Sequence, residues 1–188
     1  MRLEDYIKVY ENVIPISCVS SIIKWVDQKK LNFEDATVGD GVLDKNIRKV
    51  KTTSLMNWDD CSLTKIHWCT LINLCLINNY KRYRQEVSSE VDIKQILSID
   101  ILKYEKSGKY KMHSDHYASN PRTLSFILLL NNDYQGGELN FHDPKGNIIK
   151  TIDTAPAKLI VWPSNFLFPH SVSEVTEGVR YSIVSWAL

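Results

Sequence analysis

From residue 96 to residue 188 the sequence alternates short apolar runs with turn residues, and this alternation limits the fold more than any other feature. Eight runs of strand length are separated by turn clusters such as NNDYQGG and DPKGN. Short strands at regular spacing are typical of a sandwich or barrel in which neighbouring segments pair in antiparallel order. The pattern therefore predicts a jelly roll, with strands at 96–105, 110–115, 122–131, 136–142, 147–153, 157–163, 168–175 and 179–187.

The N-terminal half of the sequence predicts helices instead of closely spaced strands. Apolar residues recur at helical spacing over 15–30, and a longer helix with acidic and Ser/Thr residues at its start is predicted over 59–87. The segment 31–60 between them is charged and rich in Asp and Gly, so it predicts a hairpin or a mobile loop.

These observations predict a single domain over residues 1–188 whose fold class is α+β but mainly β. Residues 96–188 would form a double-stranded β-helix, the jelly-roll core. Residues 1–95 would supply helices that pack on one outer face of that core, together with a loop on the substrate side. There are no internal repeats and no linker that would divide the chain.

The overall charge gives no sign of a polyanionic partner. Lys and Arg total 23 against 22 for Asp and Glu, a formal net charge of +1, so nucleic acid is not the expected ligand. The N-terminus lacks the apolar segment of a secretory signal, and the longest apolar run, FILLL, is too short to span a bilayer. The four cysteines show no C-x-x-C spacing and are typical of reduced thiols. We therefore expect a cytoplasmic protein without a membrane segment, and the sequence does not indicate its oligomeric state.

The stretch YKMHSDHY places His113, Asp115 and His116 within four positions. On a strand, side chains two residues apart point to the same face, so His113 and Asp115 could share one metal ion while His116 points elsewhere. This motif alone arises often by chance, and a metal site requires a third ligand from another part of the chain. The candidates are the remaining histidines, His67 in the predicted long helix, His142 at a turn, and His170.

His170 differs from the other candidates because it begins a late strand, and Arg180 follows it after ten residues. Two histidines and one carboxylate leave three positions open on a metal, the arrangement expected of a non-haem Fe(II) oxygenase. Such a metal needs an electron-donating co-substrate, and an inward-facing Arg180 would suit a dicarboxylate. The alternative is a polar loop around Asp115 and a coincidental histidine at position 170.

Four ordered motifs resemble the 2-oxoglutarate and Fe(II)-dependent oxygenases, in particular the prolyl 4-hydroxylase-like branch. YEKSGKYKMHSDH is similar to that branch's tyrosine, glycine turn and H-x-D strand, and RTLSFILLLNNDYQGGELNF to its Arg-Thr/Ser-apolar-Leu-Asn run followed by Gly-Gly-Glu-Leu. HSVSEVTEGVRYSIVSW resembles its closing strand pair, and VIPISCVSSIIKWV its first helix. The likeness is strong from residue 100 onward and weak at 31–60.

The resemblance implies a role for each matching residue. His113, Asp115 and His170 would hold Fe(II), and Arg180 would bind the far carboxylate of 2-oxoglutarate, with O2 as the second co-substrate and ascorbate as a reductant. Tyr104 would offer its hydroxyl to the co-substrate or to the wall of the site. The other residues expected on the walls around substrate and co-substrate are Trp186, Tyr110, Ser125 and Leu129, although Tyr110 and Trp186 also fit ordinary strand aromatics.

One position departs from the pattern of the prolyl 4-hydroxylase-like branch. Where those relatives place a second tyrosine just before the Leu-Asn pair, this chain has Leu129. The far carboxylate then needs another hydroxyl. The sequence offers Ser125, Thr123 and Ser182 without ranking them.

The function implied by the resemblance is hydroxylation of a C–H bond, on a prolyl residue of a peptide or protein. A free amino-acid hydroxylase of the same class and a non-catalytic metal-binding jelly-roll module are the alternatives. Asp115 favours hydroxylation over halogenation, because halogenating relatives lack the carboxylate. Trp186 counts against nucleic-acid demethylation, since that branch has a second arginine six residues after the first. The Asp/Gly-rich segment 37–46 could close over a peptide substrate.

Overall fold

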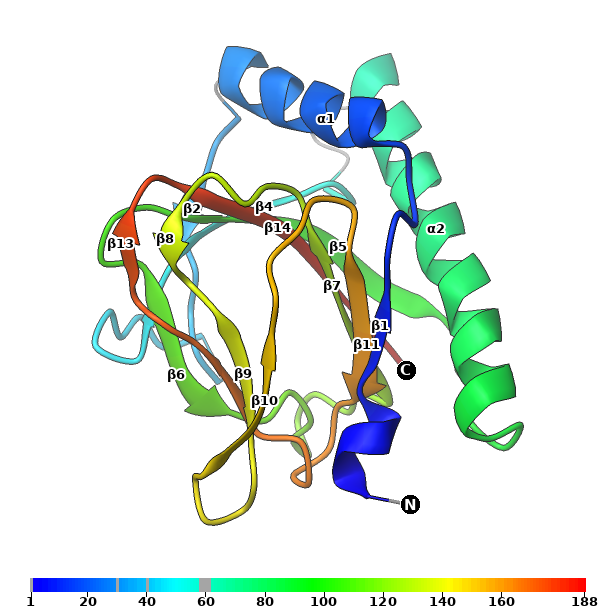
Figure 1. Ribbon diagram of the computed structural model, residues 1–188. Coiled ribbons are helices and arrows are strands. Elements are labelled where there is room, and N and C mark those ends of the chain that lie inside the picture. The colour runs from blue at the N-terminus through cyan, green and yellow to red at the C-terminus, as the bar shows by residue number, and fades with distance from the viewer. Residues whose placement is uncertain (1, 30, 40, 58–61) are drawn as a thin grey trace.

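Two antiparallel sheets face each other, and two helices pack on the outside of one of them (Figure 1). The structure, a computed structural model, describes residues 2–29, 31–39, 41–57 and 62–188. The larger sheet has seven strands in the order β1-β11-β7-β14-β5-β4-β2, and the smaller has five in the order β10-β9-β12-β6-β3. This arrangement confirms the double-stranded β-helix predicted from the spacing of apolar runs and turns.

The strands are short, as the turn spacing predicts. The seven-stranded sheet contains β1 (Lys8–Tyr10), β11 (Leu159–Pro163), β7 (Leu124–Leu129), β14 (Arg180–Ala187), β5 (Ile96–Tyr104), β4 (Lys51–Ser54) and β2 (Glu34–Asp35). The five-stranded sheet contains β10 (Ile148–Ile152), β9 (Leu139–His142), β12 (His170–Val172), β6 (Lys109–His113) and β3 (Arg48–Lys49). The remaining elements are the pair β8 (Gln135–Gly136) and β13 (Val175–Glu177), the helices α1 (Ile16–Lys29) and α2 (Leu63–Val87), and a 3-10 turn (Leu3–Tyr6).

Strand β7 is buried on both faces, which explains the unbroken apolar run FILLL. Phe126 and Leu128 point toward the helices, whereas Ile127 and Leu129 point into the space between the sheets. Successive residues of a strand face opposite sides, so a strand covered on both sides needs apolar residues throughout. The same alternation in β14 directs its even-numbered residues, beginning with Arg180, toward the opposite sheet.

The two helices occupy nearly the predicted ranges and cover the outer face of the seven-stranded sheet (Figure 1). Helix α1 buries Val19, Ile22, Trp25 and Val26, spaced at one helical face. Helix α2 begins at Leu63, where the Ser62 hydroxyl accepts a hydrogen bond from the Lys65 N–H. The predicted start at residue 59 lies outside the described residues. No helix in the described ranges is long and apolar enough to cross a membrane.

Three strands form in the segment 31–60, where the sequence suggested a hairpin or a loop. Strands β2 and β4 extend the larger sheet, while β3 pairs with β6 in the smaller one. Residues 37–46 lie between β2 and β3 and contain a bridge between Val38 and Val42. Another correction concerns the strand predicted over 110–115, because β6 ends at His113.

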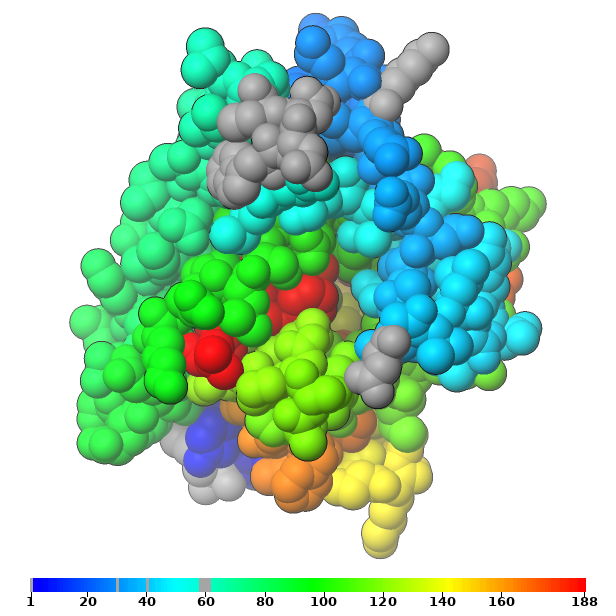
Figure 2. Space-filling model, turned by 180° about the vertical axis from the view of Figure 1, so that it is seen from behind, coloured from blue at the N-terminus to red at the C-terminus, as the bar shows by residue number. Residues whose placement is uncertain are grey.

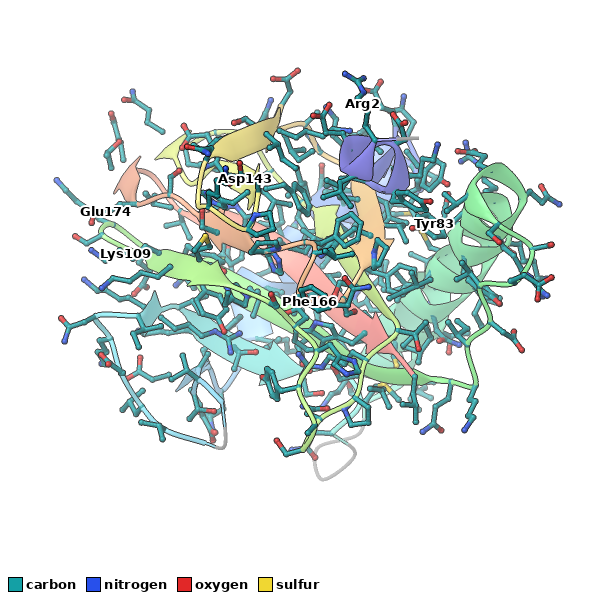
Figure 3. The ribbon with its side chains drawn as sticks, turned by 90° about the horizontal axis from the view of Figure 1, so that it is seen from below. Arg2, Tyr83, Lys109, Asp143, Phe166 and Glu174 are labelled. Atoms are coloured by element: carbon teal, nitrogen blue, oxygen red, sulfur yellow. The ribbon has the colours of Figure 1, made fainter. Side chains whose placement is uncertain are left out.

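Figure 3 labels Lys109 and Glu174 close together at one side of the sandwich, and Phe166 well apart from them. At one end Lys109, the first residue of β6, forms an ion pair of 3.0 Å with Glu174 just before β13. The segment between β11 and β12 carries Phe166, whose side chain is 75% exposed. This segment also accepts a backbone hydrogen bond from His116, at the Ser164 carbonyl. Residues 114–122 and 164–169 therefore lie side by side around the end that carries His113 and His170.

Candidate active site

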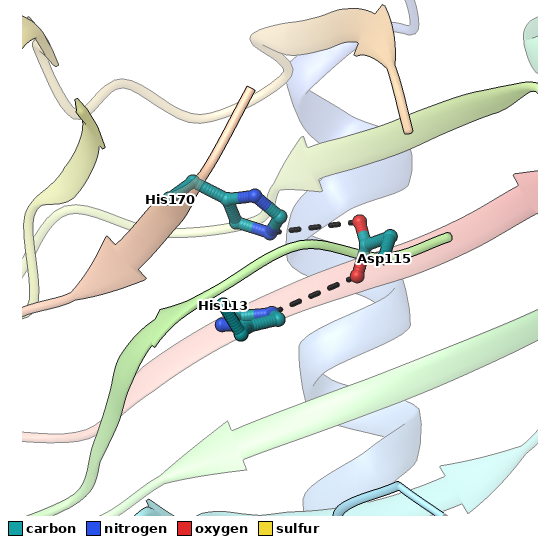
Figure 4. A group of neighbouring side chains, drawn as sticks. All are labelled: His113, Asp115 and His170. Atoms are coloured by element: carbon teal, nitrogen blue, oxygen red, sulfur yellow. Dashed lines mark ion pairs between the residues drawn. The ribbon is translucent and has the colours of Figure 1, made fainter. Parts of the chain in front are cut away.

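The structure brings His113, Asp115 and His170 together between the two sheets (Figure 4). His113 ends β6 and His170 begins β12, and the two residues are direct partners in the antiparallel register. Asp115 reaches them from just beyond the end of β6, with its carboxylate oxygens 3.6 Å from His113 Nε2 and 3.5 Å from His170 Nε2. The sequence prediction of one strand face shared by His113 and Asp115 was wrong in this detail, because the chain turns after His113 and carries Asp115 toward the opposite sheet.

Hydrogen bonds to the backbone orient both imidazoles. Nδ1 of His113 lies 2.8 Å from the Lys111 carbonyl oxygen, and Nδ1 of His170 lies 3.1 Å from that of Phe168. A carbonyl can only accept, so each Nδ1 carries a proton, and in the neutral form of either imidazole Nε2 presents its lone pair on the side of Asp115. Three acceptors therefore converge without a donor between them. A divalent cation satisfies this set, and two histidines with one carboxylate leave coordination positions open, as Fe(II) oxygenase chemistry requires.

The protonation states of these buried groups also suit a metal site. Burial lowers the pKa of His170 to about 4, so its imidazole is neutral at pH 7. Burial would raise the pKa of Asp115, but His170 and His113, whenever they carry a second proton, and the Ser125 hydroxyl outweigh it and hold that pKa well below its ordinary value. Ser125, on β7, donates a hydrogen bond of 2.6 Å to Asp115 Oδ2. The carboxylate is thus ionised and fixed to the seven-stranded sheet.

Arg180, the first residue of β14, is a buried cation without a counter-ion. Only 1% of it is exposed, and Nη1 donates to the Ser182 hydroxyl at 2.8 Å. Its Nε and Nη2 have no hydrogen-bond partner, and none of the carboxylates in the described ranges forms an ion pair with it. The guanidinium lies 5.0 Å from the ring centroid of Tyr104, its partner in the β14–β5 register. A buried charge in this state fits an anionic ligand, such as the far carboxylate of 2-oxoglutarate.

A small cavity connects the histidines with Tyr104. Its lining contains the three candidate metal ligands and aromatic and aliphatic side chains from both sheets: Leu102, Tyr104, Tyr110, Ile127, Val172, Val184 and Trp186. A larger hollow of about 600 Å³ lies between α2 and β5, but its described lining residues include no histidine, aspartate or glutamate. The chemistry therefore belongs to the smaller cavity.

Arg122 at the mouth of this cavity was not anticipated from the sequence. Its guanidinium lies 3.7 Å above the Trp186 ring, and Nη1 is 3.3 Å from the Asp115 carbonyl and 3.8 Å from its Oδ1. The antiparallel register of β7 with β14 places the residues before β7 beside the end of β14, which explains the contact. Only a prediction that β7 pairs with β14 would have indicated from the sequence that Arg122 lies beside Trp186. Arg122 and Trp186 together form a flat cationic and aromatic wall.

The other residues named from the sequence lie in different surroundings. Tyr110 stacks on His113 with ring centroids 3.5 Å apart, and Ser182 lies opposite Leu129 in the register. Thr123 is exposed and lies beside Ala187, at the end of β14 opposite to Arg180. Three histidines lie outside the cluster: His67 is exposed on α2, His142 bonds the Ser171 hydroxyl at 2.8 Å, and His116 contacts the backbone of Arg122.

Comparisons with known proteins agree with this geometry. The 2OG-Fe(II) oxygenase superfamily matches residues 99–188. A PKHD-type hydroxylase of Synechococcus sp. (strain JA-2-3B'a(2-13)) is 36% identical over 101 residues, 50% of this chain and 43% of the relative. A PKHD-type hydroxylase of Rippkaea orientalis is 34% identical over 100 residues, with the same shares of the two chains. The chain thus spans less than half the length of these relatives.

Solved structures share the fold over nearly the whole chain. One is a prolyl hydroxylase from Trichoplax adhaerens in complex with a peptide fragment of the hypoxia inducible factor oxygen degradation domain. The matched region covers 98% of this chain and 84% of the Trichoplax chain, with a TM-score of 0.82 and 18% sequence identity. A prolyl-4-hydroxylase from Pseudomonas putida covers 97% and 92%, with a TM-score of 0.76 and 16% identity. Residues 99–188 therefore carry the domain of the 2OG-Fe(II) oxygenase superfamily, and the chain as a whole has the fold seen in prolyl hydroxylases.

Proposed function

We propose that the protein is a 2-oxoglutarate and Fe(II)-dependent dioxygenase that hydroxylates a prolyl residue of a peptide or protein. The observation that carries the proposal is that the space between the two sheets holds both a set of three metal-ligating side chains and a buried guanidinium that no carboxylate of the described ranges neutralises. Three ligand atoms of His113, Asp115 and His170 lie within 4.8 Å of one another, and Arg180 lies buried and uncompensated beyond Tyr104. A metal with a bound dicarboxylic 2-oxo acid would complete both.

Each of these residues has a defined task in the proposed reaction. His113, Asp115 and His170 hold the iron, and Arg180 binds the far carboxylate of the co-substrate. When bound, iron and 2-oxoglutarate supply the oxidising chemistry, in which one oxygen atom of O2 enters the substrate and the other enters succinate while CO2 is released. Asp115 occupies the position that a halide would need, which supports hydroxylation.

The mouth of the site favours a peptide over a free amino acid. The stack of Arg122 on Trp186 lines one side, and buried N–H groups of both side chains, Nε and Nε1, have no hydrogen-bond partner. Such donors suit backbone carbonyls of an extended peptide. Phe166, 75% exposed on the neighbouring segment, adds apolar surface beyond the cavity. Figure 2 shows red atoms of the C-terminal strand at the floor of a hollow on this face.

The segment 37–46 is proposed to cover the substrate from another side. Arg48, which follows it, places its guanidinium 4.7 Å from the Tyr110 ring centroid and donates to the Thr37 carbonyl at 2.7 Å. The segment also exposes Val42 and Leu43, at 61% and 54%. Exposed apolar side chains beside a site are typical of surfaces that bind another chain.

The cytoplasm is proposed as the location. Cys18, Cys69 and Cys75 are free thiols, which supports a reducing compartment, whereas Cys61 lies outside the described residues.

Anaerobic titration with Fe(II) and 2-oxoglutarate tests the co-substrate site. We expect a weak visible charge-transfer band when the 2-oxo acid chelates the iron, and no band in Asp115→Ala. Iron binding without the band would indicate a metal-binding jelly roll that does not use 2-oxoglutarate. Failure to bind iron would refute the proposed metal site.

A substrate screen tests the second part of the proposal. Peptides with one proline each, the same peptides with alanine in its place, and free proline are incubated with the loaded enzyme, and succinate and oxygen incorporation are measured. We expect a gain of one oxygen atom only in proline-containing peptides. Turnover of free proline, with no turnover of the peptides, would show that the substrate is a free amino acid and would refute the peptide part of the proposal.

A further inference from the structure

The co-substrate end of the cavity needs a hydroxyl that the expected position does not supply. Leu129 stands directly opposite Ser182 in the β7–β14 register and has only an aliphatic side chain. Two of the three hydroxyls suggested by the sequence are engaged or distant. Ser125 is bonded to Asp115 and Ser164, and Thr123 is exposed beside Ala187, at the end of β14 opposite to Arg180. Ser182 remains beside Arg180, from which it accepts a hydrogen bond.

Tyr134, in the connection between β7 and β8, brings another hydroxyl to Arg180. Its hydroxyl oxygen is fully buried and makes no hydrogen bond of ordinary geometry, although Arg180 and Thr154 lie close enough to donate weakly to it. Burial raises its pKa, and the positive charge of Arg180 opposes that effect, so the two groups lie close together. Thr154 also lies near this hydroxyl.

Gly137 shows how the two side chains approach each other. A Cβ at this position would lie 3.0 Å from Arg180 Cδ and 3.2 Å from Tyr134 Cε2, so both side chains occupy the space that a larger residue would fill. The φ of +68° at Gly137 is a conformation that favours glycine. Because Gly137 has no side chain, the side chains of Tyr134 and Arg180 can both pack against its Cα.

The connection that carries Tyr134 is held by several hydrogen bonds. Asn131 donates to the Val179 carbonyl at 2.7 Å and accepts from the Tyr181 N–H at 2.7 Å. The Tyr134 backbone also packs against Gly178, where a Cβ would lie 3.0 Å from Tyr134 Cα. Tyr134 is therefore held in place by the start of β14, the strand that carries Arg180.

We propose that the Tyr134 hydroxyl, together with Arg180, binds the far carboxylate of 2-oxoglutarate and replaces the hydroxyl that is missing at Leu129. This inference rests on the proposed function. In the part of the chain that the structure describes, the Tyr134 O–H has no acceptor, and the Arg180 Nη2–H has none of ordinary geometry, with only the Tyr134 oxygen nearby. A carboxylate offers two oxygens and a negative charge, so it satisfies both donors and the guanidinium charge at once. Tyr134 is thus assigned to binding of the co-substrate.

Calorimetric titration of the Mn(II)-loaded protein, which does not turn over, tests the inference. Tyr134→Phe removes only the oxygen atom and is expected to weaken 2-oxoglutarate binding roughly ten- to hundred-fold, as for a lost hydrogen bond to a charged group. Tyr80→Phe is the matched control, because the Tyr80 hydroxyl bonds Val91 and Asp92 on the helical side of the molecule. Its affinity should equal that of the wild type.

A second ligand separates a direct contact from a general disturbance. 2-Oxopentanoate keeps the 2-oxo acid but lacks the far carboxylate, so Tyr134→Phe should bind it as the wild type does. Equal weakening for both ligands, or unchanged 2-oxoglutarate affinity, overturns the assignment of Tyr134. If Ser182→Ala weakens binding and Tyr134→Phe does not, Ser182 is the missing hydroxyl. A wild-type protein that binds 2-oxoglutarate no better than 2-oxopentanoate would refute the carboxylate site itself, and the proposed function with it.

Discussion

Replacement of Arg180 should stabilise the ligand-free protein and strongly reduce its stabilisation by 2-oxoglutarate. The guanidinium is buried, and two of its nitrogens, Nε and Nη2, have no partner. An unsatisfied buried polar group costs about 1–3 kcal/mol. Arg180→Met keeps the length of the apolar stem, removes both unsatisfied groups and loses one hydrogen bond to Ser182, worth about 1 kcal/mol. The net gain in unfolding free energy is about 1–3 kcal/mol after incomplete repacking.

Thermal unfolding with and without ligand measures this effect. For a chain of this size, a gain of that magnitude raises Tm by about 2–12 °C. Addition of 2-oxoglutarate at about 100 times the wild-type Kd to the Mn(II)-loaded protein should raise the Tm of the wild type, since such binding contributes about 2.7 kcal/mol, and raise the Tm of the variant by at most about a third as much. The loss of affinity corresponds to about 2–5 kcal/mol, or roughly thirty- to several-thousand-fold in Kd.

Lys158→Met provides the control for this reasoning. Lys158 is also a buried cation, but its ammonium donates to the Asp153 carbonyl at 2.9 Å and lies 3.5 Å from Glu11. Removal of a satisfied cation should lower Tm. A lower Tm for Arg180→Met as well would show that the guanidinium stabilises the fold, and the argument from its missing partners would be refuted.

Three further substitutions probe the rest of the site. His170→Ala should abolish both tight Mn(II) binding in calorimetry and iron-dependent succinate production, and retention of both would show that the third ligand is another residue. Ser125→Ala, which removes the hydrogen bond to Asp115, should lower metal affinity about 10–100-fold in a chelator competition, whereas unchanged affinity would exclude a role in orienting the carboxylate. Gly137→Ala should weaken 2-oxoglutarate binding because its Cβ displaces Arg180, and wild-type affinity would show that the guanidinium position is not critical.

The parts of the site that lie on regular strands were the most predictable from the sequence. The position of His170 at the start of a strand and of Arg180 ten residues later follows from patterns of alternation, and both occur in the structure. The sharing of one face by Arg180 and Trp186 follows from even spacing along β14. Such predictions succeed because side-chain direction in a strand depends only on local geometry.

The parts that depend on loops and on register were not predictable. The sequence around His113 does not show that the following turn directs Asp115 to Ser125, because this contact depends on the relative placement of the two sheets. Arg122 reaches Trp186 through the pairing of β7 with β14, which joins segments about 60 residues apart. Tyr134 lies in a connection whose path depends on hydrogen bonds to β14. Propensity carries no information on such long-range contacts.

The short segment 114–122 joins the proposed metal site to the proposed substrate mouth. It carries Asp115 near its beginning and Arg122 at its end, where the guanidinium covers Trp186. Any substrate that orders this segment through Arg122 also fixes the carboxylate that binds the metal. Because coupling between two binding events is reciprocal, the factor by which substrate tightens the metal equals the factor by which the metal tightens substrate. Iron retention during purification should therefore improve in the presence of the true substrate, which gives a way to recognise it without turnover.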